Sequence, residues 1–353
     1  MINTMLFYNL FYFTVPLIAI VCSFFRDNRK LFLVLIGSLM ILILTFRGIN
    51  VGSDTITYYN IFNWSGNANL TDMTQSSVEI CYLFLNKFVH LIGGNFTLLL
   101  FVIAVITIFG ILYFIYTVSS NVVMSIIVFI GFTYYFMSFN ISRQFLAIGI
   151  DLAASAFLIK GKRWQSLILI IIAGLMHNSG YLYLILWLLI NSAKITKKKF
   201  VLFTGITAVL SIPISKLIGN YMANNERYGI YTNNTVENKG LFGILFAIVL
   251  LLLLIMMVVN FDFENNKLVD RYILVAFTFI VLIDLLSIFY PFLGRIRYSF
   301  EVLLIVIVPY LVVEYKFERF NLITNTALFL VGIVIMNSLI PNNIFYGIVP
   351  YFG

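Results

Sequence analysis

The chain has 353 residues, of which 62% are hydrophobic and 10% are charged. Soluble domains carry about a quarter charged residues, so this composition excludes a soluble protein and predicts a bundle of membrane-spanning helices. The net charge of +8 does not point to nucleic acid, because basic residues that flank spans are the usual signal of membrane orientation. The sequence shows no cluster of metal ligands, and we expect no cofactor.

Twelve apolar segments predict an all-α, polytopic bundle that forms a single integral membrane domain over residues 1–353. No Lys or Arg precedes the first segment, and a basic cluster follows it. This predicts an uncleaved first helix with an external N-terminus. Two longer segments, 47–94 and 219–240, are expected to be external loops. The predicted spans are 3–25, 31–46, 96–118, 122–139, 143–159, 164–176, 180–192, 200–218, 241–260, 272–290, 298–313 and 322–340.

Segment 79–94 is apolar but contains Glu79, Lys87 and His90 and ends in Gly93-Gly94. Cytoplasmic loops are enriched in Lys and Arg. If this segment does not cross, five basic clusters all fall on the cytoplasmic side, whereas a crossing would move residues 197–199 outside. We therefore predict an interfacial or re-entrant helix on the outer side, with both chain termini external.

Charged residues on the outer side are not required for orientation, and charge at membrane depth is a functional candidate. Arg47 ends the second predicted span and begins the stretch RGINVGSDTITYY. Asp54 lies in this stretch, and Tyr58 follows one helical turn later on the same face. The alternative for Asp54 is an ordinary helix N-cap.

Three further outer positions stand out. Glu79 opens the interfacial segment, where it would also suit the positive end of a helix dipole. Arg143, followed by Gln144, opens span 143–159; the alternative is a structural arginine that has Asp151 as its partner in the bundle. His177 lies in LMHNSGY, at a tight turn between two short spans.

Arg295 and Arg297 lie in FLGRIRYSFE, beside Pro291 and Gly294, which favour a broken helix. Two external arginines at such a break suit an anionic ligand, because the guanidinium forms bidentate bonds to phosphate. Pairing of Arg297 with Glu301, one turn later, is the structural alternative.

The order of these elements resembles the EpsG-like family of Wzy-type polysaccharide polymerases. The resemblance spans about residues 40 to 315, and the loop residues Arg227-Tyr228 and Tyr231 and the terminal Pro350-Tyr351 are similar as well. One departure is Cys81, where the family pattern has glycine. The elements are Arg47 with Gly52, Asp54 and Tyr58; Glu79 before an apolar run; Arg143-Gln144 with Ala147; His177 with Ser179; and Arg295 with Arg297-Tyr298.

The resemblance implies a GT-C-like membrane glycosyltransferase on the outer face of the bacterial inner membrane. Such an enzyme polymerises oligosaccharide repeat units of O-antigen, capsule or exopolysaccharide that are carried on undecaprenyl diphosphate. The expected partners are this lipid-linked oligosaccharide, membrane lipid and a chain-length regulator, with no nucleic acid.

The leaving group of this reaction is an anionic diphosphate, which arginines at the membrane surface would stabilise. The attacking sugar hydroxyl needs a base, which a carboxylate or a neutral imidazole can provide. The sequence does not choose among the three candidate bases. The predicted roles are diphosphate binding by Arg47, Arg143, Arg295 and Arg297; base catalysis by Asp54, Glu79 or His177; and substrate contact by Tyr58, Gln144, Arg227 and Tyr298.

Two other functions fit the composition. A flippase or transporter would use acids within spans, and Asp151, Asp284 and Glu301 are such acids. No basic residue is expected at the depth of Asp284, which disfavours a charged path. A membrane O-acyltransferase that modifies polysaccharide would use His177, but the sequence contains no second, paired histidine.

Overall fold

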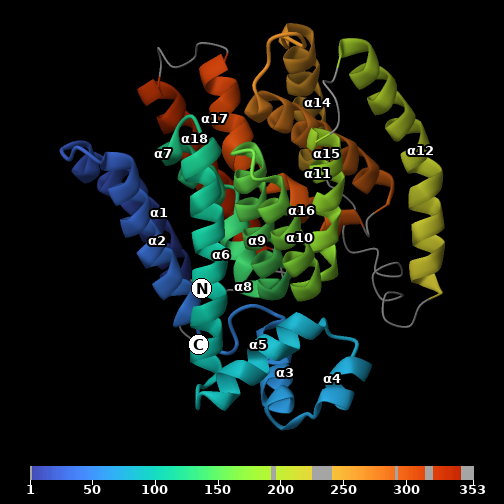
Figure 1. Cartoon of the computed structure of the whole chain (residues 1–353). Coiled ribbons are helices and arrows are strands. Elements are labelled where there is room, and N and C mark those ends of the chain that lie inside the picture. The colour runs from blue at the N-terminus through green and yellow to red at the C-terminus, as the bar shows by residue number, and fades with distance from the viewer. Residues whose placement is uncertain (1, 192–195, 225–240, 291–292, 315–320, 343–353) are drawn as a thin grey trace. The chain divides into compact units, whose positions relative to one another are not determined.

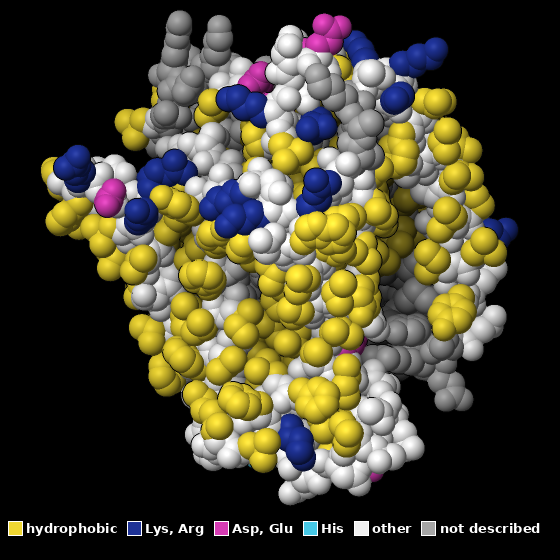
Figure 2. Space-filling view, in the orientation of Figure 1, with side chains coloured by type: hydrophobic (Ala, Val, Ile, Leu, Met, Phe, Trp, Pro, Cys, Tyr) yellow, Lys and Arg dark blue, Asp and Glu magenta, His cyan; other side chains and the backbone are white. Residues whose placement is uncertain are grey.

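The computed structural model describes residues 2–191, 196–224, 241–290, 293–314 and 321–342. Within these ranges the regular elements are helices, and no strand occurs, which confirms the all-α class. In the described part of the chain, eight helices are long and apolar enough to cross a membrane, or ten if each of two broken pairs counts as one span. Figure 2 shows hydrophobic side chains covering the long sides of the helices, as expected for a surface that faces lipid.

The chain forms two compact units, residues 1–184 with 305–353 and residues 185–304. The first unit contains α1 (Ile2–Ser23), α2 (Asn28–Thr45), α3 (Thr55–Asn67), α4 (Leu70–Gln75), α5 (Ile80–Leu91), α6 (Phe96–Val118), α7 (Val122–Gly131), α8 (Tyr134–Asn140), α9 (Ser142–Ile159), α10 (Arg163–Met176), the 3₁₀ helix η1 (Asn178–Leu182), α17 (Leu304–Glu314) and α18 (Asn321–Asn342). The second contains α11 (Tyr183–Asn191), α12 (Lys197–Ala223), α14 (Leu241–Asn260), α15 (Leu268–Phe289) and α16 (Gly294–Glu301).

In the first unit, α9 is the central helix and packs between α6 and α10. The α6 and α9 backbones touch at Gly110 and Gly149, where an added Cβ on Gly110 would collide with the Gly149 carbonyl. Small residues permit this close approach, which is a common basis of helix packing in membranes. The first turns of α9 are thereby fixed within the bundle.

The 23 residues of α6 span about 34 Å, enough to cross the hydrocarbon core. At its C-terminal end, Arg29 donates to the Ser119 carbonyl over 3.2 Å and Lys160 Nζ donates to the Tyr113 hydroxyl over 3.1 Å. The basic clusters 26–30 and 160–163 therefore lie at the same end of the unit, which we call the basic end.

The helices α3, α4 and α5 lie at the other end of α6 (Figure 1). Phe96, the first residue of α6, contacts the rings of Tyr59 and Phe62 on α3, with centroids 5.3 and 5.9 Å apart. Segment 47–94 is thus separated from the basic end by the length of α6, as the orientation argument requires. We call this the α3–α5 end, and its external location stays a prediction.

Helix α5 has 12 residues and a length of about 18 Å, which is too short to cross a bilayer. One face is buried against the unit through Tyr82, Leu83, Asn86 and Val89. The opposite face exposes Phe84, Phe88 and Leu91, at 46%, 58% and 76%. A short helix with one apolar face outward agrees with the predicted interfacial helix.

Four predicted spans differ from the observed helices. Segment 164–176 is the 14-residue α10, and 180–192 is divided between η1 and the nine-residue α11, so both fall short of a full span. Segment 122–139 is broken into α7 and α8, which meet at 49°, with Thr133 in the left-handed region at φ 68°. Segment 298–313 is α16 and α17, whose break lies at residues 302–303; Pro291 is outside the described residues.

The placement of α5 can be tested with single cysteines at its two ends, Ser77→Cys and Asn95→Cys, on a background with Cys22→Ala and Cys81→Ala. A membrane-impermeant maleimide added to spheroplasts is expected to label both positions. Asn28→Cys, at the basic end, is the control that should react only after lysis. Protection of either α5 end until lysis would show that this helix crosses the membrane.

Candidate functional site

The site predicted in the first unit is built on the segment Phe139–Arg143, which joins α8 to α9 and which we call the α8–α9 junction. Every residue of the junction except Arg143 is buried, and Arg143 is half-buried. The junction lies at the α3–α5 end, because α9 runs from Ser142 to the basic end near Lys160. Three chain segments that are distant in sequence attach to it.

Arg47 follows α2 and is 6% exposed. Its guanidinium donates to the Leu44 carbonyl over 2.6 Å and to Ser142 Oγ over 2.9 Å, and it lies over the Phe139 ring at 5.6 Å. The side chain therefore joins the end of α2 to the start of α9. Arg47 therefore has a structural function in addition to its predicted contact with the diphosphate.

Asp54 stands at the N-cap position of α3, but its side chain makes no capping hydrogen bond. Its backbone N–H donates to Asn140 Oδ1 over 2.9 Å. The alternative function of the Asp54 carboxylate, that of an ordinary N-cap, is therefore not observed. Burial raises the pKa of Tyr58, one turn along α3, and the Asp54 charge raises it further, so the Tyr58 hydroxyl is neutral at physiological pH.

Glu79 and Arg143 form an ion pair of 3.0 Å between the start of α5 and the start of α9. Their side chains are 8% and 16% exposed, so the pair is largely shielded from water. The second Glu79 oxygen accepts from the Asn178 N–H over 3.3 Å, which connects α5 to the turn after α10. Gln144 is buried beside Arg143 in sequence.

Tyr82 is a site residue that the sequence analysis missed. Its ring is fully buried, lies under the Arg143 guanidinium at 5.6 Å and meets Tyr58 edge to face at 6.3 Å. Burial raises the pKa of Tyr82 to about 12, and the nearby Arg143 charge opposes this rise. Its spacing of three residues from Glu79 places both on one face of a helix, which is the signal that could have identified it.

His177 caps η1 with its ring. Nδ1 accepts from the Ser179 N–H over 3.2 Å and lies 2.8 Å from Ser179 Oγ. Because a backbone N–H can only donate, Nδ1 must carry a lone pair, and the neutral ring holds its proton on Nε2. In this arrangement Nε2 is a hydrogen-bond donor rather than a base.

The second unit contains the other predicted arginines, on α16. Arg297 Nη1 lies 3.7 Å from Asp284 Oδ1, and Arg297 Nε lies 3.3 Å from Glu301 Oε1. The structural alternative of an Arg297–Glu301 pair is therefore present. Arg297 also lies over the Tyr298 ring at 5.2 Å.

The pairing with Arg297 corrects the expectation that no basic residue lies at the depth of Asp284, because α16 folds back onto α15. Arg295 is half-buried on the same helix. Arg227 lies outside the described residues. Among those described, no group of three His, Cys, Asp or Glu side chains could hold a metal ion.

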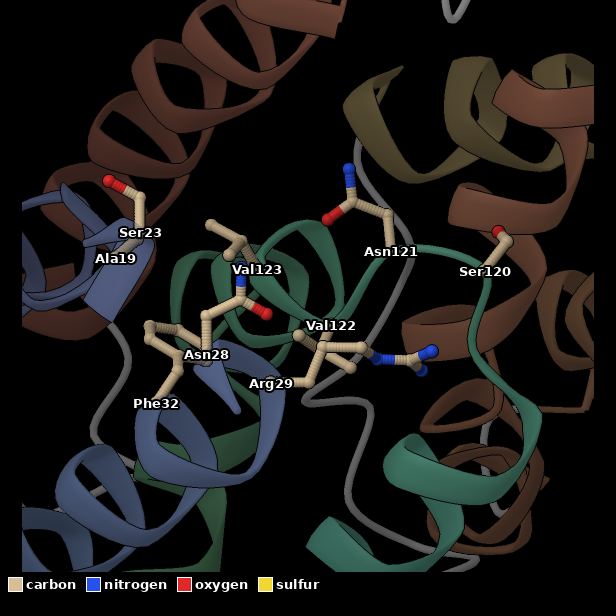
Figure 3. Close-up of a pocket in the computed structure, with 9 residues that line it drawn as sticks. All are labelled: Ala19, Ser23, Asn28, Arg29, Phe32, Ser120, Asn121, Val122 and Val123. Atoms are coloured by element: carbon tan, nitrogen blue, oxygen red, sulfur yellow. The ribbon is translucent and has the colours of Figure 1, made fainter. Parts of the chain in front are cut away.

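A cavity of about 300 Å³ lies at the basic end of the first unit, between the α1–α2 turn and the start of α7 (Figure 3). Arg29 lines it and donates to the carbonyls of Tyr116 and Ser119, at the C-terminus of α6. A cation at this position satisfies terminal carbonyls and the helix dipole. This cavity is separate from the α8–α9 junction and contains none of the predicted site residues.

The Glu79–Arg143 pair is expected to stabilise the fold. Arg143→Met leaves a shielded carboxylate without its cation and should lower the free energy of unfolding by about 3 kcal/mol. Glu79→Gln combined with Arg143→Met should cost less than the sum of the two single changes. Denaturant titration in detergent micelles measures all four forms. Additive losses would show that the two side chains do not interact.

Comparison with known proteins adds one finding. The family model described as the EpsG family matches residues 30–352, which is most of the chain. No curated protein and no solved structure matches the chain. The chain therefore belongs to the EpsG family, the Wzy-like family of polysaccharide polymerases.

Proposed function

We propose that this protein polymerises oligosaccharide repeat units carried on undecaprenyl diphosphate, at the outer face of the bacterial inner membrane. The observation that carries the proposal is the set of charged and aromatic side chains gathered at the α3–α5 end, around the α8–α9 junction. The opposite end carries the basic clusters that set orientation. Family membership supports the same chemistry.

The reaction replaces a glycosyl–phosphate bond with a glycosidic bond. The hydroxyl oxygen at the non-reducing end of a new unit attacks C1 of the growing chain, and the bond from C1 to the diphosphate oxygen breaks. The hydroxyl proton passes to a base, and undecaprenyl diphosphate leaves as an anion. The protein must therefore provide cations near the leaving group and a base near the hydroxyl.

Arg143 is the cation of the first unit that best fits the diphosphate. It is half-buried at the α3–α5 end, and its present partner, Glu79, carries a single charge. A diphosphate carries more charge and offers more acceptor oxygens for the planar guanidinium. Nε2 of His177, on the turn that Glu79 also contacts, provides a second donor. For Arg295 and Arg297, which lie in the second unit, contact with the diphosphate stays a prediction from the sequence.

Asp54 is our choice for the base. Both oxygens of Glu79 are engaged, one by Arg143 and one by the Asn178 N–H. His177 carries its proton on Nε2, so this nitrogen cannot accept another in the neutral form. The carboxylate of Asp54 does not cap α3, and its position at the start of that helix places it beside Tyr58, whose neutral hydroxyl can hold a sugar.

The proposal predicts the products of three single variants in cells that make the polymer. Arg143→Ala, His177→Ala and Asp54→Asn should each lose long chains and retain carriers capped with one repeat unit, because the donor is made but not transferred. The measurement is gel separation of lipid-linked glycans by length. Lys160→Ala removes a positive charge at the basic end and should leave the ladder unchanged.

Two outcomes would contradict the proposal. Normal ladders in all three variants, at wild-type protein levels, would remove the assigned residues from the reaction. Single repeat units that fail to reach the outer surface would instead indicate a flippase.

A further inference from the structure

The side chain of Asn140, the last residue of α8, makes contacts that could not be predicted from its position in the sequence. It is 1% exposed, and its Oδ1 lies 2.8 Å from Ser53 Oγ and 2.9 Å from the Asp54 nitrogen. The Asp54 N–H can only donate, so the atom that faces it is the amide oxygen. Asn140 thus accepts two hydrogen bonds from a segment 86 residues earlier in the chain.

The segment held by Asn140 is also fitted to the junction by its backbone. Gly52 has φ +91°, a region that favours glycine, and an added Cβ there would collide with the Phe139 carbonyl oxygen. Thr55 Oγ1 lies 3.4 Å from the same carbonyl oxygen. The segment from Gly52 to Thr55 therefore has little freedom to shift along the α8–α9 junction while these contacts persist.

The contact with Asn140 holds Asp54 by its backbone, and the Asp54 side chain is not the cap of α3. The Asp side chain at an N-cap normally accepts a backbone N–H of its own helix, and here it does not. The start of α3 is secured instead by the amide of Asn140, which accepts the Asp54 N–H. The tether fixes the Asp54 backbone and leaves the carboxylate out of the capping interaction.

We propose that Asn140 is a positioning residue that holds Asp54 in place for the transfer reaction by accepting hydrogen bonds from Ser53 and Asp54. The inference rests on the proposed function, because it assigns Asn140 an effect through Asp54. Asn140 does not touch the reacting atoms. Its contribution is the geometry of the base, and catalysis is sensitive to small displacements of such groups.

The test compares Asn140→Leu, which keeps the size of the side chain and removes the acceptor, with Asn140→Asp, which retains an acceptor oxygen. Purified protein in nanodiscs is supplied with lipid-linked repeat units, and kcat and KM are measured. Asn140→Leu should lower kcat on the order of tenfold, because the loss of both accepted hydrogen bonds lets Asp54 shift, with KM little changed. Asn140→Asp should recover most of the rate. Asn60→Leu, an exposed position on α3, is the matched control.

The double variant Asn140→Leu with Asp54→Asn separates positioning from an independent effect. If Asn140 acts through Asp54, the double variant should be no slower than Asp54→Asn alone, because groups that act as a unit are not additive. Additive losses, or an Asn140→Asp variant as slow as Asn140→Leu, would overturn the inference.

A measurement without turnover keeps this test distinct from that of the proposed function. A nitroxide at Thr57→Cys, exposed on α3, on the background lacking Cys22 and Cys81, should become more mobile in Asn140→Leu and remain ordered in Asn140→Asp. An unchanged spectrum in Asn140→Leu would show that the tether does not hold α3. An ordered nitroxide together with a wild-type kcat in the Asp54→Asn variant would instead contradict the role of Asp54 in the proposed function.

Discussion

The attachment of three distant segments to the α8–α9 junction is the constraint on which the predicted site of the first unit depends. Ser142 accepts from Arg47, Asn140 accepts from the Asp54 N–H, and Arg143 pairs with Glu79. The junction is itself held by the close contact of α9 with α6. Side chains at residues 47, 54 and 79 are therefore positioned by one short segment, which runs from the end of α8 to the first turn of α9.

One buried apolar cluster makes this arrangement rigid. It connects the non-spanning helices α3 and α5 to the spanning bundle, so the α3–α5 end is part of the core of the unit rather than a loose loop. Where the chain contacts water, the burial of apolar surface such as this is the main force that drives folding. The cluster consists of Tyr58, Phe62, Tyr82, Val89, Leu99, Ile103, Leu146, Ala147, Ile150 and Ala173.

The sequence was sufficient for the fold class and for the long spans, because runs such as 96–118 are apolar over a full bilayer thickness. It also predicted, from the distribution of the basic clusters, that segment 79–94 does not cross the membrane, and the 12-residue length of α5 agrees with this prediction. It overestimated the number of full spans, since apolar composition alone does not reveal that a segment such as 180–192 begins as a 3₁₀ turn.

Individual site residues could be selected from charge at membrane depth, but their pairing could not. The Glu79–Arg143 and Asp284–Arg297 pairs depend on how helices fold against each other. Asn140 was missed because a lone amide in FMSFNIS carries no local signal, and its function depends on a turn 86 residues away. The location of the site at the outer face and its chemistry remain proposals supported by family membership.

Direct binding of the leaving group tests the central claim that charged side chains at the junction form a diphosphate site. Purified protein in nanodiscs is titrated with undecaprenyl diphosphate and, separately, with undecaprenyl monophosphate. The account predicts tighter binding of the diphosphate and a loss of affinity on the order of tenfold in Arg143→Ala, the effect of one charge-assisted hydrogen bond. Equal affinity of wild type and Arg143→Ala for the diphosphate would contradict it.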